Sequence, residues 1–267
     1  MKGSFSKYFY IYRMQILKSF NYKFTVYGNI ITQTIIMIAS AFFWKALYRG
    51  KDAVMGVSVD TMLTYTVVSS MISILLTTNV ERRIQMSVRK GTIAVDMMRP
   101  INVFRGFFAE DLGNMTALIF QNLLPVLVIG TIFIGFPTPS STGNFFLFLV
   151  SLILAYMINW TMAALFGMLA FSIVELDALI QVKKHLIRLL SGSIIPMWFM
   201  PLWFRNILEC LPFVYLYQMP LNIYVGQYTN ESLIKGLSIQ AAWAVALLLI
   251  YIVRQKRVGK KLMIQGG

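Results

Sequence analysis

Long apolar runs, separated by shorter polar segments, recur along the whole chain. A helix needs about 20 apolar residues to cross the hydrocarbon core of a bilayer. We predict membrane spans at residues 26–47, 61–80, 112–136, 144–173, 178–199 and 232–253. The fifth of these differs from the rest because it carries Lys183, Lys184 and Arg188 at its inner end. The pattern predicts an all-α polytopic membrane protein with six transmembrane helices in a single domain, residues 1–267.

Composition supports this class and excludes several others. The chain is 58% hydrophobic and 13% charged, whereas a soluble domain is about 45–50% apolar and about 25% charged. One cysteine excludes a disulfide framework and a paired-cysteine metal site. One histidine and ten acidic residues leave little for a metal cluster or an acid–base active site. The chain also lacks a GxxxxGK[ST] phosphate loop, so we expect that it does not hydrolyse ATP alone.

The basic residues predict the topology. With the N-terminus inside, 19 of the 24 Lys and Arg residues fall in cytoplasmic segments. The positive-inside rule then places both termini in the cytoplasm of a multi-pass protein. The net charge of +14 needs no nucleic-acid partner, because anionic membrane lipids are sufficient to explain it.

Residues 1–25 precede the first span and predict an amphipathic helix. Lys7 and Lys18 project from the face opposite to an apolar stripe. The stripe consists of Phe5, Tyr8, Phe9, Tyr12, Ile16 and Phe20. This pattern is typical of an interfacial helix that lies flat on the inner leaflet. Packing of the same helix against the bundle is the alternative, and the two placements are compatible.

A short helix is predicted within the inner loop, residues 81–111. Thr92 can cap this helix and Pro100 ends it. Ile93 and Met97, together with Met98, would offer apolar contacts, and flexible Met side chains suit docking into a groove of a partner. The alternative is a loop that lies against the lipid headgroups.

The stretch from 191 to 213 is apolar but interrupted by Pro196, Pro201 and Pro212. Each proline lacks an N–H group and costs the interior of a helix about 3 kcal/mol. The stretch is therefore too interrupted for a span and too apolar for a free loop. Arg205 and Glu209 stand four residues apart and could pair at the outer interface.

Polar residues recur inside two predicted spans. Span two carries Thr66, Ser69, Ser70, Ser73 and Thr77, and span four carries Asn159. Such residues either join helices or line a pathway. Ionisable residues are almost absent from the middle of the spans, which counts against an ion-coupled carrier and an intramembrane enzyme.

The order of these features resembles the permease subunits of type-2 ATP-binding-cassette exporters, over nearly the whole chain. The resemblance rests on six spans, a basic N-terminal helix, GTIAVDMMRP after span two and a Ser-Gly…Pro…Pro…Pro stretch after span five. It implies that residues 91–99 form a coupling helix that docks into an ATPase. These residues are Gly91, Thr92, Ile93, Ala94, Val95, Asp96, Met97, Met98 and Arg99. It also implies that residues 201–227 form an outer re-entrant hairpin, with Pro212 at its tip and Pro220 in its second arm.

The resemblance implies a function as the membrane-spanning subunit of an ATP-driven exporter in the cell membrane of a bacterium. Its cargo would be a drug, lipid, peptide or saccharide. A second permease, the same or a related chain, and two ATPase subunits would complete the complex. ATP and Mg²⁺ would bind to the ATPase, and this chain would bind no cofactor. The alternatives are a carrier or channel that works without ATP, and a membrane-embedded lipid-modifying enzyme.

Overall fold

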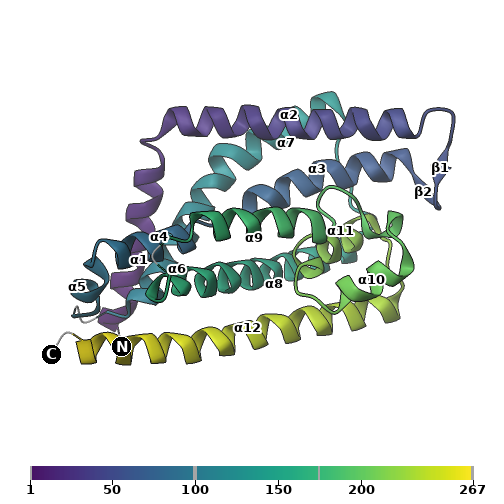
Figure 1. Ribbon diagram of the computed structural model, residues 1–267. Helices are drawn as coiled ribbons and strands as arrows, with labels where there is room; N and C mark the ends of the chain where they lie inside the picture. The colour runs from purple at the N-terminus through teal and green to yellow at the C-terminus, as the bar shows by residue number, and fades with distance from the viewer. Residues whose placement is uncertain (1, 99–100, 174, 266–267) are drawn as a thin grey trace.

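The computed structural model describes residues 2–98, 101–173 and 175–265. Long helices run roughly along one axis and form an elongated bundle (Figure 1). The long helices are α2 (Lys23–Leu47), α3 (Val59–Leu75), α6 (Val103–Leu118), α8 (Thr142–Gly167) and α12 (Asn230–Gln265). A two-residue antiparallel pair, β1 (Ala53–Val54) and β2 (Val57–Ser58), joins α2 to α3.

Five segments of the described chain are long and apolar enough, by length and composition, to cross a membrane. They are Lys23–Leu47, Val59–Arg89, Val103–Phe133, Thr142–Phe171 and Asn230–Val258. Each contains most of one predicted span, and the all-helical polytopic class is confirmed. The third segment passes through a π-helical turn, Ile119–Leu123, directly before α7 (Leu124–Phe133). Pro125 follows that turn, as expected where a proline removes a backbone hydrogen bond.

The predicted span at 178–199 is not one helix. Its helix, α9 (Asp177–Leu190), has 14 residues, about 21 Å in length, which is less than the hydrocarbon thickness. The helix ends at Ser191 because Gly192 adopts a positive φ of 80° and Pro196 lacks a donor. The count of six spans therefore stays a prediction.

The predicted loop at 81–111 is mostly helical, which corrects its description as a loop. It contains α4 (Val80–Arg89), α5 (Thr92–Met98) and the beginning of α6. The apolar run ends before Glu81, whereas the helical backbone continues beyond it with charged residues. Hydropathy marks where the apolar surface ends, and a helix can extend past that point.

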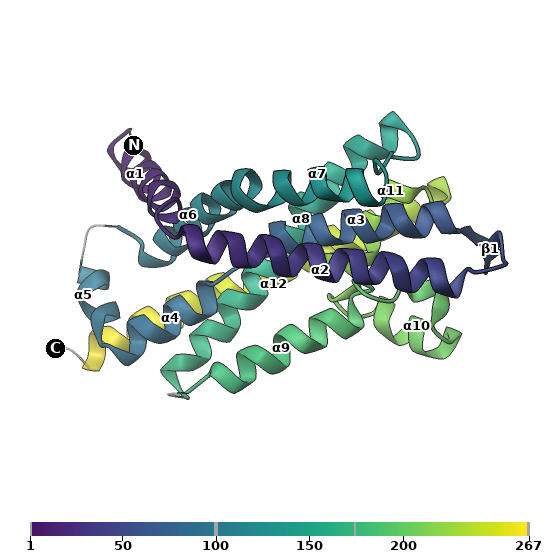
Figure 2. The same cartoon turned by 90° about the horizontal axis from the view of Figure 1, so that it is seen from above.

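The N-terminal helix α1 (Lys2–Ser19) lies at one end of the bundle and runs transverse to the long helices (Figures 1 and 2). It packs on α6, where the Tyr12 hydroxyl donates to Thr116 Oγ1 at 3.1 Å. Gly113 allows this close approach, because a Cβ there would lie 2.5 Å from the Tyr12 carbonyl oxygen. The helix thus packs on the bundle in an orientation that also suits an interfacial helix.

Helix α8 lies at the centre of the core. Its buried residues Ile158 and Ala163 belong to one apolar cluster with residues of α3, α4, α11 (Gln218–Val225) and α12. Two buried polar residues link helices of this core: Ser151 and Gln240 exchange hydrogen bonds of 2.9 Å between α8 and α12. Helices α1 and α5 and the C-terminal part of α12 lie at one end of the bundle, and β1, β2 and α10 (Leu202–Glu209) lie at the other (Figure 1).

Candidate functional site

A polar cavity of about 430 Å³ lies between α2, α3 and α9. Its lining includes all six predicted polar residues: Thr66, Ser69, Ser70, Ser73, Thr77 and Asn159. Four of the hydroxyl groups donate to backbone oxygens, as Ser69 does to Ser193 at 2.7 Å and Ser70 does to Thr66 at 3.0 Å. The polar stripe therefore both joins elements and faces the cavity, so the two sequence interpretations are compatible.

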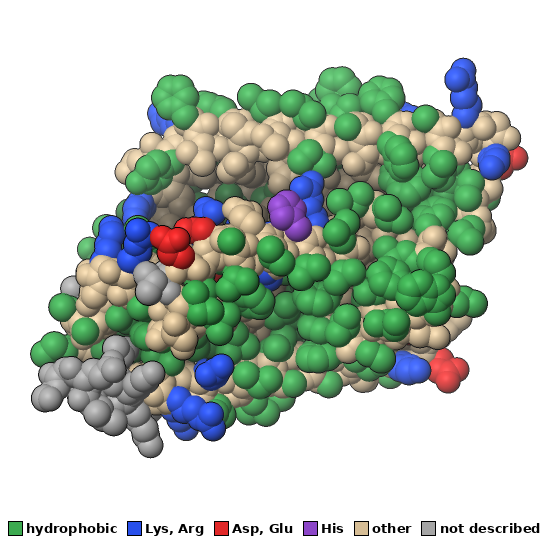
Figure 3. All heavy atoms as spheres, in the orientation of Figure 1, with side chains coloured by type: hydrophobic (Ala, Val, Ile, Leu, Met, Phe, Trp, Pro, Cys, Tyr) green, Lys and Arg blue, Asp and Glu red, His purple; other side chains and the backbone are tan. Residues whose placement is uncertain are grey.

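Charged side chains lie at one end of this cavity. Lys183 of α9 forms an ion pair with Glu81 of α4, and both side chains are buried, with 4% and 1% exposure. Lys184 and Arg188 of α9 also line the cavity and are exposed. On this face the molecule is hollowed between α2 and α9, with blue Lys and Arg side chains beside the hollow (Figure 3). The sequence predicted few ionisable groups within the bundle. The Glu81–Lys183 pair could not be predicted, because Glu81 and Lys183 are 102 positions apart in the chain.

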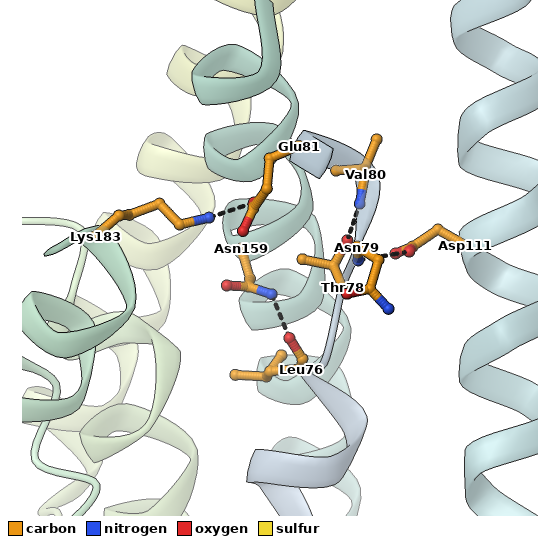
Figure 4. Close-up of polar contacts among 8 residues, drawn as sticks. All are labelled: Leu76, Thr78, Asn79, Val80, Glu81, Asp111, Asn159 and Lys183. Atoms are coloured by element: carbon orange, nitrogen blue, oxygen red, sulfur yellow. Dashed lines mark hydrogen bonds and ion pairs between the residues drawn. The ribbon is translucent and has the colours of Figure 1, made fainter. Parts of the chain in front are cut away.

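The second span is broken between α3 and α4. Buried polar side chains form hydrogen bonds with backbone groups at the break (Figure 4). Asn159 Nδ2 donates to the Leu76 carbonyl oxygen at 2.6 Å. The backbone N–H of Asn79 donates to Asp111 Oδ1 at 3.4 Å, and the Tyr156 hydroxyl donates to Asp111 Oδ2 at 3.0 Å. Freed backbone groups inside a bundle require such partners. The sequence predicted one continuous span here, at 61–80, and did not predict this break.

The predicted coupling helix forms as α5, preceded by Gly91 with a positive φ of 69°. Its apolar residues do not all face outward. Ile93 is buried, with 2% exposure, and packs into the core, which corrects its assignment as a docking contact. The exposed large apolar residues of α5 are Val95, at 59%, and Met98, at 86%. Arg99 lies outside the described residues.

The environment of α5 includes a second hollow. A groove of about 730 Å³ lies between α1 and α6, and Asp96 of α5 contributes to its lining. Lys18 of α1 and Glu110 of α6 line the same groove. The groove beside α5 is therefore lined by both charged and apolar side chains.

The proline-interrupted segment forms two short helices, α10 and α11, at the end of the bundle opposite to α5. Pro201 precedes α10, Pro212 lies in the turn after it, and Pro220 lies in the first turn of α11. Residues 218–224 of α11 are all buried, so this arm is packed inside the bundle. Pro196 precedes a single 3₁₀ turn, Met197–Phe199.

The predicted Arg205–Glu209 pair does not form among the described ion pairs. Arg205 Nη2 donates instead to the Trp198 carbonyl oxygen at 3.2 Å. The Glu209 carbonyl oxygen accepts from the Tyr215 hydroxyl at 2.9 Å, which links the end of α10 to the following turn. The carbonyl oxygens of Trp198 and Glu209, which lie near the prolines, therefore accept hydrogen bonds from the side chains of Arg205 and Tyr215.

Gln218 is the centre of the hydrogen-bond network beneath this segment. Its Oε1 accepts from the Tyr65 hydroxyl and from the Met197 backbone N–H, each at 3.0 Å. Its Nε2 donates to Asn222 Oδ1 at 2.7 Å, and Tyr65 also donates to the Gly192 carbonyl oxygen at 2.6 Å. Sequence reasoning did not single out Gln218, which is buried and joins α3, the turn after α9, and α11.

Comparison with known proteins agrees with this architecture. Residues 34–266 match the family model described as ABC-2 family transporter protein. No curated protein and no solved structure matches the chain. Because the match covers most of the chain, it shows the family. The chain belongs to the ABC-2 transporter family and is a membrane component of an ABC-type transporter, which associates with an ABC ATPase.

Proposed function

We propose that the chain is the permease of an ATP-driven exporter and that the 430 Å³ cavity is part of its transport path. The observation that carries this proposal is the position of the polar stripe. Hydroxyl side chains of α3 and the amide of Asn159 of α8 line a cavity beside a core that consists mainly of apolar residues. Polar residues that line a cavity inside a membrane protein are typical of substrate pathways.

The cavity supports a dimer of permeases. It opens between α2 and α9, and a single chain leaves this side uncovered (Figure 3). A second permease, either another copy or a related chain, would close the path along these helices. We place α1, α5 and both termini in the cytoplasm, and the β1–β2 turn and α10 outside the cell membrane, because most basic residues then lie inside.

Coupling to the ATPase would pass through α5 and α4. The exposed Val95 and Met98 would dock into the ATPase, where ATP and Mg²⁺ bind. Helix α4 follows the break at the end of α3 and carries three ion pairs, Glu81–Lys183 and Arg82–Asp177 to α9 and Arg83–Glu110 to α6. A displacement of α5 would therefore move the base of α9, which forms one wall of the cavity.

The outer segment would close the path on the other side. Helix α11 and the 3₁₀ turn before α10 are held to α3 through Gln218, which accepts from the Tyr65 hydroxyl and the Met197 N–H. A separation of α3 from α9 would strain this network, because Tyr65 and Ser69 of α3 donate to Gly192 and Ser193 after α9. The network is thus suited to a gate that opens when the two walls move apart.

Purification from native membranes tests the proposal. We expect the affinity-tagged chain to co-purify with a soluble subunit that contains a phosphate loop, and with a second permease, identified by mass spectrometry. The purified complex should hydrolyse ATP. Isolation of the chain without any ATPase, under conditions that preserve other ABC complexes, would contradict the proposal. A self-sufficient carrier would instead transport in vesicles without ATP.

A further inference from the structure

The polar cavity has an excess of positive charge. Four charged residues are among its described lining: Glu81, Lys183, Lys184 and Arg188. Glu81 and Lys183 neutralise one another as a buried ion pair. Lys184 and Arg188 form no ion pair within the described part of the chain. Two cations therefore face a cavity whose one carboxylate is already paired.

The two cations share one face of α9, because they are four residues apart. Arg188 stands in the last turn of α9, where the helix dipole stabilises a cation. Tyr217 and Ser73 line the same cavity as Arg188, so the cationic face reaches the polar stripe of α3. Ionisable residues that face a cavity of a membrane protein are functional-site candidates by default.

The remaining lining is mixed in polarity. Thr66, Ser69 and Ser70 contribute hydroxyl groups, whereas Ile36, Trp44 and Ile194 contribute apolar surface. A molecule that satisfies all of these groups has an anionic group, further hydrogen-bonding groups and an apolar part. Neutral or cationic molecules would leave Lys184 and Arg188 without a counter-charge.

We propose that Lys184 and Arg188 receive the anionic group, a phosphate or carboxylate, of an amphipathic cargo that occupies this cavity. The inference rests on the proposed function of the cavity as part of the transport path. Arg188 can bind such a group through two parallel N–H donors, and Lys184 acts as a point charge beside it. The anion can belong to a membrane lipid or to a dissolved amphiphile, since both present the same chemistry.

Binding of three matched probes tests the site. The permease–ATPase complex, in nanodiscs of phosphatidylcholine and without ATP, is titrated calorimetrically with hexyl phosphate, hexyl glucoside and hexyltrimethylammonium. We expect hexyl phosphate to bind at least about tenfold more tightly than the other two. In the Lys184→Gln/Arg188→Gln variant, the affinity for hexyl phosphate should fall by about tenfold or more, and that for hexyl glucoside should stay within about twofold.

Two control variants accompany this test. Arg254→Gln/Lys256→Gln removes the same charge from exposed positions on α12 and should retain the preference for the anion. Lys184→Arg/Arg188→Lys retains both charges and should also keep it, which excludes misfolding as the cause of the loss. Equal affinities for the three probes in the parent, or an unchanged preference in the Gln variant, would overturn the proposal.

Nanodiscs that contain phosphatidylglycerol identify the source of the anion. A lower apparent affinity for hexyl phosphate indicates that a lipid headgroup occupies the site, and an unchanged affinity indicates a dissolved amphiphile; either result supports the site. Binding is measured without ATP, so its outcome is independent of transport. A complex that binds the anion but does not transport would refute the proposed function and leave the site intact.

Discussion

Lys183 of α9 and Glu81 of α4 form an ion pair that is almost completely buried. Burial makes such a pair costly to form and more costly to break, because the remaining charge has no partner. Lys183 also lies 5.6 Å from the centroid of the Phe166 ring. The pair fixes the base of the cavity wall to the helix that precedes α5, and it is the most direct physical link between the proposed coupling surface and the cavity.

Removing one partner of this pair should destabilise the protein. We expect Lys183→Met to lower the free energy of unfolding by about 3–5 kcal/mol, because Glu81 is left as an unpaired buried carboxylate. The Glu81→Gln/Lys183→Met variant should recover much of this loss, because no charge remains buried. Thermal unfolding of the purified permease measures both variants. Equal stability of the parent and Lys183→Met would show that the pair is not buried in the folded protein.

The Gln218 network should control the stability of the outer segment. Gln218→Leu removes the acceptor for Tyr65 and Met197, and an unsatisfied buried donor costs about 1–3 kcal/mol. We expect faster proteolysis between residues 192 and 213, with proteolysis of the α5 region unchanged. Gln227→Leu makes the same change at an exposed position after α11 and serves as the matched control. Identical cleavage of the parent and Gln218→Leu would contradict the role of this network.

Topology is tested by two matched cysteine substitutions. Lys51, after α2, and Lys90, at the end of α4, are both exposed and lie near opposite ends of the bundle. In a Cys210→Ala background, a membrane-impermeant thiol reagent should label Lys51→Cys in intact cells and Lys90→Cys only after lysis. Labelling of Lys90→Cys in intact cells would invert the proposed orientation, and equal labelling of both would contradict the arrangement of spans.

Much of the fold could be predicted from the sequence, because apolar runs report directly on which helices can lie in a bilayer. The break before α4, the length of α9 and the position of Ile93 could not. Helix α4 continues as a charged, amphipathic helix where hydropathy ends. Ile93 and Val95 are both apolar, and only the packing of α5 on the bundle determines which of them is buried.

The candidate site was predicted in part for a similar reason. The hydroxyl residues of α3 lie on one side of the helix, so their spacing in the sequence was enough to group them. The partners of Glu81 and Gln218 come from distant segments, and no local pattern specifies them. The three basic residues of α9 were interpreted through topology, whereas the structure buries Lys183 and places Lys184 and Arg188 at the cavity.

Coupling through α5 is the central claim, and binding of the ATPase to α5 variants tests it most directly. Val95 and Met98 are exposed, three residues apart on one face of α5, and both lie outside the core. Met55, in the turn at the opposite end of the bundle, is 70% exposed and provides the control variant Met55→Asp.

We expect Val95→Asp/Met98→Asp to cost about 2–4 kcal/mol of the free energy of ATPase binding. The measurement is the dissociation constant of the ATPase for the permease in nanodiscs. The account predicts that it rises by about 30-fold or more for Val95→Asp/Met98→Asp and stays unchanged for Met55→Asp. An unchanged dissociation constant for the α5 variant, with a folded permease, would contradict it.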